Sequence, residues 1–251
     1  MTLSDLQIAS FKKAGYISPI RIADQTQADY CRDQFNQLEA REGREKSMIG
    51  LLDRHMDHPF IWELATQPDI LDCIEAVIGP NILLLATHFF CKYGGSSDRF
   101  VAWHQDVTYW GLEPPMAVTA WFAVDDSDRD NGCMQIIPGT HAAGIREHGK
   151  SAQDGNLLSI NQEVNMSPEQ EKTAVDLILK AGEMSIHHGL TIHGSLPNQS
   201  DRRRCGLTMR YVPTFVKQVN ANSMGIRYHA LLVRGQDEEK HFGEMDPPSF
   251  K

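Results

Sequence analysis

The sequence predicts an α+β domain that is mainly β and of the sandwich or jelly-roll type. Three observations support this prediction. Helical periodicity is confined to the first third of the chain, many short strand-like runs follow from residue 81 onward, and no helical period separates one run from the next. Parallel strands need long crossover connections, which are usually helical, so this order favours antiparallel strands over a βαβ sheet.

The three predicted helices lie within the first 80 residues. A helix from Ser4 to Lys13 has a suitable N-cap in its first residue, and Gly15 is suited to end it. A second helix is predicted over residues 25–42, where apolar residues recur at steps of three and four. A third is predicted over residues 68–78, which a Gly-Pro pair ends.

The rest of the chain has the texture of strands separated by clusters of Gly, Pro, Asn and Asp. The predicted strands cover residues 81–93, 118–124, 134–137, 175–179, 184–187 and 206–212. The acidic stretch 125–132 between two of them is predicted to be an exposed turn.

Composition and charge disfavour several functional classes. The chain has 251 residues, of which 41% are apolar and 23% charged, as in an ordinary globular domain. Its net charge of −9 disfavours nucleic acid as a partner, because polyanion binding needs a basic face. No run approaches the roughly 18 apolar residues that cross a bilayer, and the N-terminus lacks the features of a signal peptide. Five widely spaced cysteines without a Cys-x-x-Cys pair are typical of reduced thiols, so we expect a cytoplasmic protein without a membrane or nucleic-acid partner.

The segment His104-Gln105-Asp106 is the sharpest chemical motif. In a strand, residues i and i+2 project from the same face, so His104 and Asp106 should point together. An imidazole and a carboxylate side by side provide two of the three ligands of a 2-His-1-carboxylate iron site. An isolated His-x-Asp pair also occurs frequently by chance, so the motif needs support from elsewhere in the chain.

His193 is the best candidate for the third ligand, because it ends a strand-like stretch and Arg204 follows eleven residues later. A guanidinium can hold a carboxylate through two parallel hydrogen bonds. Arg204, with the hydroxyl of Ser195, therefore suits the distal carboxylate of 2-oxoglutarate. His187 and His188 are rival ligands, although a place in the core or beside a ligand is the more frequent role for such histidines.

Several segments carry a family resemblance when they are taken in order. They are Phe11–Tyr16, Leu71–Asn81, His104–Asp106, Thr119–Trp121, Asn131–His141, His193–Ser195 and Arg204. Together they resemble the phytanoyl-CoA dioxygenase family of Fe(II)/2-oxoglutarate oxygenases over residues 4 to about 213. The resemblance implies a double-stranded β-helix, which is a cupin-like jelly roll, with N-terminal and flanking helices.

The same resemblance implies roles for individual residues. Iron would be held by His104, Asp106 and His193, and 2-oxoglutarate would meet Arg204 and Ser195, with Trp121, Gln105 and Lys46 lining its pocket. The family couples substrate oxidation to the conversion of 2-oxoglutarate and O2 into succinate and CO2. Relatives that halogenate have a small residue in place of the carboxylate, so Asp106 implies hydroxylation or desaturation.

The substrate is expected to be a small, polar or anionic metabolite. Tyr109 and Trp110 follow the first two ligands and are candidates to face it, although packing in the core is the commoner role of such residues. Arg210 shares the parity of Arg204 on its predicted strand, and it could bind an anionic group or form a surface salt bridge. The chain has no basic cluster suited to the phosphates of coenzyme A, which disfavours an acyl-CoA substrate.

We expect a single domain over residues 1–251. Residues 1–80 are predicted to be mainly helical support, 81–213 the jelly-roll core, and 214–251 a C-terminal tail or lid. Two other functions stay open at this point: a non-catalytic ligand-binding jelly roll with a vestigial metal site, and a zinc-dependent hydrolase. The presence of all three ligand types disfavours the first, and the lack of a His-x-x-x-His motif disfavours the second. The oligomeric state is not indicated.

Overall fold

The computed structural model describes residues 2–95, 98–158 and 160–250, and its framework is two antiparallel sheets. The main sheet has six strands in the order β1 (Tyr16–Arg21), β10 (Glu183–His188), β5 (Val118–Ala123), β12 (Arg204–Pro213), β2 (Ile82–Lys92) and β14 (Leu231–Arg234). The smaller sheet has the order β3 (Val101–His104), β11 (His193–Ser195), β6 (Met134–Ile136) and β9 (Val175–Leu177). Two short pairs join β13 (Lys217–Gln218) to β4 (Leu112–Glu113) and β7 (His148–Lys150) to β8 (Gln162–Val164). This arrangement confirms the predicted α+β, mainly β jelly roll.

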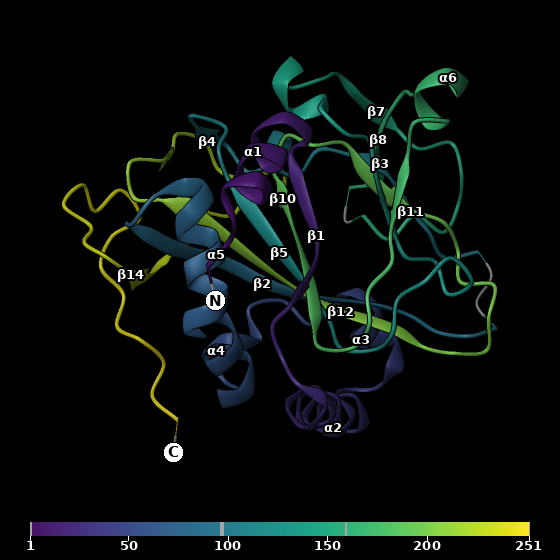
Figure 1. Cartoon of the computed structure of the whole chain (residues 1–251), viewed down its shortest axis with the longest axis horizontal. Helices are drawn as coiled ribbons and strands as arrows, with labels where there is room; N and C mark the ends of the chain where they lie inside the picture. Colours follow the sequence, from purple (N-terminus) through teal and green to yellow (C-terminus); the bar gives the residue numbers. More distant parts are fainter. Residues whose placement is uncertain (1, 96–97, 159, 251) are drawn as a thin grey trace.

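The helices precede most of the strands, as the periodicity predicts. They are α1 (Asp5–Ala14), α2 (Gln25–Glu42), α3 (Arg44–Ile49), α4 (Pro59–Ala65), α5 (Pro68–Ile78) and α6 (Pro168–Glu171), with single 3-10 turns η1 (Arg54–Met56), η2 (Asp106–Tyr109) and η3 (Thr140–Ala143). Ser4 caps α1 through a reciprocal capping box with Gln7, and Gly15 ends it in the left-handed conformation. In Figure 1, α2, α4 and α5 gather on one side of the main sheet, and the smaller sheet lies away from them.

The main sheet separates an apolar core from a polar interior. On β12, the side chains of Cys205, Leu207 and Met209 belong to the core cluster that the helices cover. The alternate residues Arg204 and Arg210 face a cavity on the other side of the sheet. The period of two along a strand therefore places apolar residues against the helices and polar residues in the interior of the jelly roll.

Two strands of the main sheet come from segments that were predicted to lie outside the jelly-roll core. Strand β1 falls within the region expected to be helical support, yet it forms an edge of the main sheet through pairing with β10. Strand β14 falls within the predicted tail and adds the opposite edge by pairing with β2. Within the C-terminal segment, Leu231–Arg234 is therefore part of the main sheet, and the Arg234 guanidinium also pairs with Asp72 and Glu75 of α5.

The structure corrects two smaller expectations. The acidic stretch 125–132 is not fully exposed, because Ser127 and Asn131 are buried in it and the Asn131 amide donates a hydrogen bond to a backbone carbonyl of the same stretch. Cys91 and Cys205 face each other across β2 and β12 as a disulfide, whereas five reduced thiols were expected; Cys31, Cys73 and Cys133 are buried.

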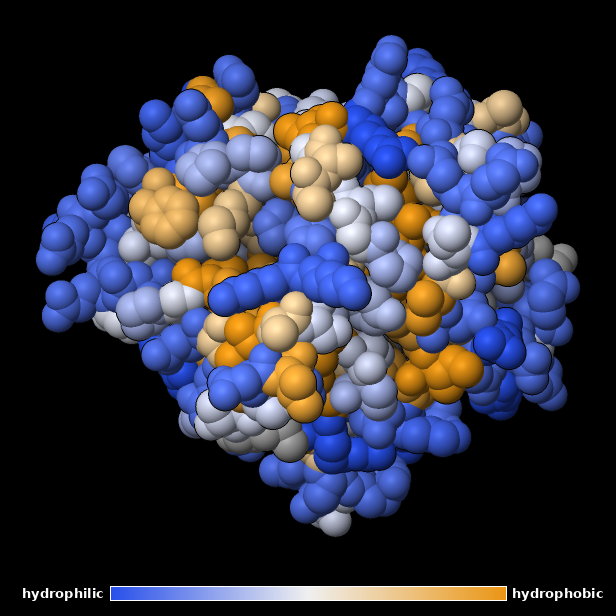
Figure 2. Space-filling model, turned by 45° about the horizontal axis from the view of Figure 1, so that its top comes forward, coloured by the Kyte–Doolittle hydropathy of each residue, from blue (hydrophilic) through white to orange (hydrophobic). Residues whose placement is uncertain are grey.

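No helix among the described residues is both long and apolar enough to cross a bilayer. Figure 2 shows apolar patches that polar side chains interrupt, with polar residues around the outline of this face. Apolar residues dispersed in this way are normal for a protein surface.

Candidate metal centre and its two cavities

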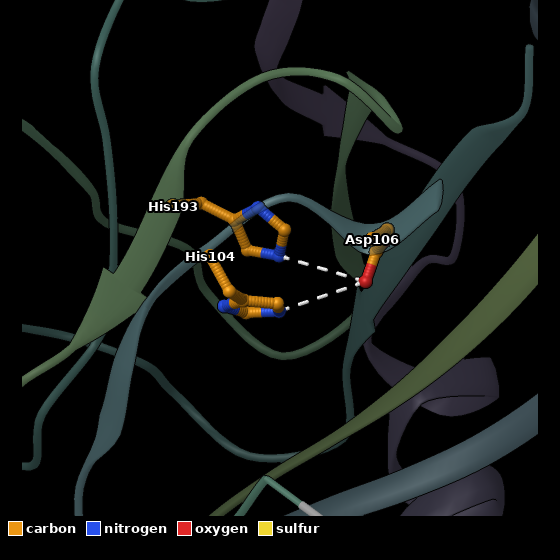
Figure 3. A group of neighbouring side chains, drawn as sticks. All are labelled: His104, Asp106 and His193. Carbon is orange, nitrogen blue, oxygen red and sulfur yellow. Dashed lines mark ion pairs between the residues drawn. The ribbon is translucent and has the colours of Figure 1, made fainter. Parts of the chain in front are cut away.

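Three buried side chains from separate elements converge at one point (Figure 3). His104 ends β3, Asp106 begins η2 and His193 begins β11, where it lies opposite His104 in the strand register. The Nε2 atoms of His104 and His193 lie 3.6 Å and 4.0 Å from Oδ1 of Asp106. Asp106 belongs to a 3-10 turn and not to a strand, so the turn, and not strand alternation, brings its carboxylate back toward His104.

Backbone carbonyls fix the orientation of both imidazole rings. Nδ1 of His104 donates to the carbonyl of Ala102 at 2.9 Å, and Nδ1 of His193 donates to the carbonyl of Thr191 at 3.0 Å. Because Nδ1 carries the proton, each Nε2 presents a lone pair to the space beside Asp106. Burial and the nearby His104 hold the pKa of His193 well below its ordinary value, so this ring is neutral and able to bind a metal.

The Asp106 carboxylate is held from its other side. Its Oδ2 accepts a hydrogen bond from the Thr119 hydroxyl at 2.8 Å and lies 3.4 Å from Nε2 of His187. Burial alone would raise the pKa of Asp106, but the neighbouring imidazoles of His104, His187 and His193 lower it well below the usual value. Oδ1 is thus a charged ligand atom, while His187 lies beside a ligand. His187 and His193 lie on strands of different sheets, β10 and β11, and approach Asp106 from its two sides.

The three residues fit a divalent transition metal. Two neutral imidazole nitrogens and one carboxylate oxygen form a 2-His-1-carboxylate set, which occupies one face of an octahedron and leaves positions open. All three side chains line a small cavity, and His104 and Asp106 also line a larger one, so the open positions have space beside them. Iron(II) bound here would supply the activation of dioxygen.

A small cavity of about 40 Å³ extends from these ligands into the jelly roll, and Trp121, Ser195 and Arg204 line it. The Arg204 guanidinium lies 5.2 Å from the centre of the Trp121 ring, and its Nε donates to the carbonyl of Gly132 at 3.0 Å. Burial lowers the pKa of Arg204 to about 10, which leaves it cationic at neutral pH. Gly206 is required here, because a Cβ at this position would lie 2.0 Å from the Trp121 ring.

A second cavity of about 770 Å³ shares His104, Asp106 and Arg210 with the first. Tyr109 and Trp110 line it, and the Arg210 guanidinium lies 5.0 Å from the centre of the Trp110 ring. Part of its wall comes from the C-terminal segment, through Asn222–Met224 and Ile226–His229. The larger cavity therefore reaches the metal-binding group from the side of the C-terminal segment.

Comparison with known proteins decides the family. The family model for phytanoyl-CoA dioxygenase (PhyH) matches residues 11–206, which is most of the chain. The chain belongs to the phytanoyl-CoA dioxygenase family. It is 27% identical over 198 residues to the peroxisomal phytanoyl-CoA dioxygenase of Homo sapiens, a match that covers 77% of this chain and 54% of the human protein. The chain thus spans about half the length of such curated relatives.

Other proteins that are similar to this chain carry the names of different activities. A probable alpha-ketoglutarate-dependent hypophosphite dioxygenase of Stutzerimonas stutzeri is 25% identical over 202 residues, covering 80% of this chain and 70% of that protein. The non-heme monooxygenase ThoJ superposes with a TM-score of 0.78 at 26% identity, covering 97% of this chain and 89% of ThoJ. CytC3, solved with Fe(II) and alpha-ketoglutarate, has a TM-score of 0.69 at 27% identity, covering 96% and 92%. These relatives and structural neighbours are thus oxygenases, among them proteins named for alpha-ketoglutarate or solved with Fe(II) and alpha-ketoglutarate.

The structure corrects two residues that the family resemblance placed in the co-substrate pocket. Lys46 lies on α3, where its side chain is 53% exposed and pairs with Glu42, and it lines neither cavity. Gln105 is fully buried, but its amide donates to the carbonyls of Gly144 and Leu190 and lines neither cavity. Gln105 points away from its two neighbours and holds two loops together.

Other residues of the site are absent from the sequence prediction. Thr119 lies two residues before Trp121 on β5, so strand alternation could have predicted that both side chains face the interior. Asp53 lines the large cavity from a left-handed backbone position that no sequence pattern marked. Lys92 lies buried next to Arg204 at the end of β2, and only the pairing of β2 with β12 reveals it.

Proposed function

We propose that this oxygenase hydroxylates or desaturates a small anionic metabolite and releases succinate and CO2. The observation that carries the proposal is the buried group of His104, Asp106 and His193, which borders both a cavity holding Arg204 and a larger cavity holding Arg210. One cavity is suited to the co-substrate and the other to the substrate.

In the small cavity, Arg204 and Ser195 would bind the distal carboxylate of 2-oxoglutarate. Within the described residues, Arg204 forms no ion pair, and no carboxylate lies close enough to affect its pKa. A buried guanidinium without a counter-charge is costly, so an anion that enters this cavity is bound strongly. Trp121 packs against the guanidinium and limits its movement. These residues orient the co-substrate so that its keto acid end meets the three ligands.

In the large cavity, Arg210 is placed to bind an anionic group of the substrate. Arg99, Arg210 and Arg227 line this cavity, whereas its carboxylates are Asp53 and the ligand Asp106. In the described part of the chain Arg210 forms no ion pair, and its buried Nε has no hydrogen-bond partner. Its stacking on Trp110 fixes the plane of the guanidinium. The interior orientation of Arg210 supports a recognition role over a surface salt bridge.

We also propose that the C-terminal segment is a fixed wall of the substrate cavity and that the chain is one domain. Residues 222–229 follow β13 and precede β14, so both ends of the wall are anchored by strand pairing. The side chain of Asn222 holds the turn by accepting hydrogen bonds from the backbone amides of Met224 and Ile226. A wall built in this way bounds the substrate without the need for a moving lid.

Succinate release tests the proposed reaction. Protein loaded with iron(II) without oxygen is mixed with 2-oxoglutarate, air and pairs of small metabolites, each pair a carboxylate or phosphonate and its neutral amide or ester. We expect stimulated succinate release with the anionic member and none with the neutral one. His104→Ala and Asp106→Ala should abolish it, because each removes a metal ligand. Turnover that survives either change would contradict the metal assignment.

Arg210→Gln tests the substrate assignment. A charge-assisted hydrogen bond contributes about 1.5–3 kcal/mol, so KM for the anionic substrate should rise by roughly 10-fold to 100-fold. The Kd of 2-oxoglutarate should stay unchanged. Arg129→Gln, which removes an exposed arginine paired with Asp176, is the matched control. An unchanged KM in the Arg210 variant, or equal turnover of the neutral compounds, would contradict anion recognition.

A further inference from the structure

Lys92 is a buried lysine that the roles given above do not include. It ends β2 and is 1% exposed. Its Nζ donates to Oγ of Ser195 at 2.6 Å, to the carbonyl of Ser195 at 3.2 Å and to the carbonyl of Gly132 at 3.5 Å, and the carbonyl of Leu196 also accepts from it. No carboxylate in the described part of the chain pairs with it.

Lys92 and Arg204 form a pair of buried cations. They lie directly opposite each other in the register of β2 and β12, and both donate to the carbonyl of Gly132. Burial and the neighbouring Arg204 lower the pKa of Lys92 well below its usual value. Two buried positive charges without a counter-charge are unfavourable, and an anion placed beside them relieves both the desolvation and the repulsion.

The hydrogen bonds of Lys92 also decide what the Ser195 hydroxyl can do. An ammonium has three donors and no acceptor, and four oxygens surround this one. Because Oγ of Ser195 already accepts from Lys92, the serine proton has to be donated elsewhere. Ser195 lines the small cavity, where Arg204 also lies, so its proton is available to a carboxylate oxygen bound there.

We propose that Lys92 is a positioning residue of the 2-oxoglutarate site, which sets Ser195 as a hydrogen-bond donor and adds a second positive charge behind Arg204. The inference rests on the proposed co-substrate role of Arg204 and Ser195. Lys92 does not line the cavity, so it acts on the distal carboxylate through Ser195 and through its charge. It should not affect the keto acid end of the co-substrate, which meets the metal ligands.

The test compares two ligands in the iron(II)-loaded protein by calorimetry without oxygen. 2-Oxoglutarate carries the distal carboxylate, and 2-oxobutyrate has the same keto acid end without it. Lys92→Met should weaken 2-oxoglutarate binding by about 10-fold and change 2-oxobutyrate binding by less than about twofold. Lys180→Met, in which an exposed lysine paired with Asp126 is changed, is the matched control and should alter neither. Equal weakening of both ligands would mean a merely structural role and would overturn the inference.

A double-mutant cycle tests whether Lys92 acts through Ser195. In the Ser195→Ala background, Lys92→Met should cost less than about threefold in 2-oxoglutarate affinity, because the hydroxyl that Lys92 orients is already gone. An undiminished 10-fold loss in that background would overturn the positioning role. Lys92→Gln, which keeps a donor on a shorter side chain, replaces Lys92→Met in the cycle if the methionine variant does not fold.

Arg204→Met separates failure of the inference from failure of the proposed site. If Arg204→Met removes the preference for 2-oxoglutarate over 2-oxobutyrate and Lys92→Met does not, the co-substrate site stands and the role of Lys92 is refuted. If neither variant changes that preference, the co-substrate site itself is misplaced and the inference falls with it.

Discussion

Thr119→Val removes one hydroxyl from behind the metal centre and leaves the three ligands in place. The Thr119 hydroxyl donates to Oδ2 of Asp106 at 2.8 Å, and both residues are buried. Valine has nearly the same shape, so the substitution removes the hydrogen bond without opening a large cavity. The remaining contact to Oδ2 comes from His187 at 3.4 Å. The carboxylate therefore gains freedom to rotate away from the two histidines.

The expected size of this effect follows from the hydrogen bond. A buried hydrogen bond to a charged group contributes about 1.5–3 kcal/mol. The hydrogen bond is present with and without metal. Thr119→Val therefore removes from the free energy of metal binding only the share of the hydrogen-bond energy that holds Oδ1 toward the histidines. We take this part as about half, or about 0.8–1.5 kcal/mol, which corresponds to a rise of about 4-fold to 13-fold in the Kd of the metal. The upper end of this range reaches the usual effect of residues that hydrogen-bond to metal ligands.

Calorimetric titration of the metal-free protein with Mn(II) measures this Kd without redox chemistry. Asp106→Ala should abolish the binding that Thr119→Val only weakens. The matched control is Thr66→Val, which removes a hydroxyl that donates to the backbone carbonyl of Trp62 at 2.8 Å in α4. A folded Thr119→Val protein with unchanged Mn(II) affinity would refute the idea that Thr119 orients the ligand.

Two further outcomes are expected. Burial lowers the pKa of His55 from 6.5 to about 4. As the pH falls, the imidazole of His55 is therefore protonated in the unfolded chain before it is protonated in the folded protein. The free energy of unfolding that is present above pH 6.5 is lost toward pH 4, and the loss is about 2 kcal/mol at pH 5. Urea unfolding of the metal-free protein measures the loss, and a pH slope unchanged in His55→Gln would contradict this cause. Gln105→Ala removes hydrogen bonds to the carbonyls of Gly144 and Leu190, so it should lower the free energy of unfolding by about 2–3 kcal/mol. The affinity for 2-oxoglutarate should persist, whereas its loss at unchanged stability would place Gln105 in the pocket.

Local sequence patterns determined much of the scaffold. The capping box at Ser4 and the glycine at 15 specify α1, because caps satisfy backbone groups within a few residues of the helix end. The long apolar run that became β2 and the alternation along β12 predicted strands for the same reason, since side-chain direction follows from local backbone geometry. The same alternation predicted that Arg204 and Arg210 share a face.

Pairing between distant segments decided what local patterns could not. The edge strand β1 has no apolar run of its own and is defined by its partner β10, far along the chain. Lys46 fell outside the pocket for a related reason: its place depends on how α3 packs, which no short pattern encodes. Gln105 still has an extended backbone, so side-chain alternation turns it to the face opposite His104, and the distant loops at Gly144 and Leu190 supply its partners there.

The sequence by itself determined the kinds of ligand, two imidazoles and a carboxylate, and the arginine that accompanies them. Tertiary structure decided their convergence, the support of Asp106 by Thr119 and His187, and the placement of Lys92 behind Ser195. The physical reason is that a side chain's chemistry belongs to the residue. The distance between two side chains depends on strand register and on packing across the whole fold. Residues that are far apart in the chain determine both.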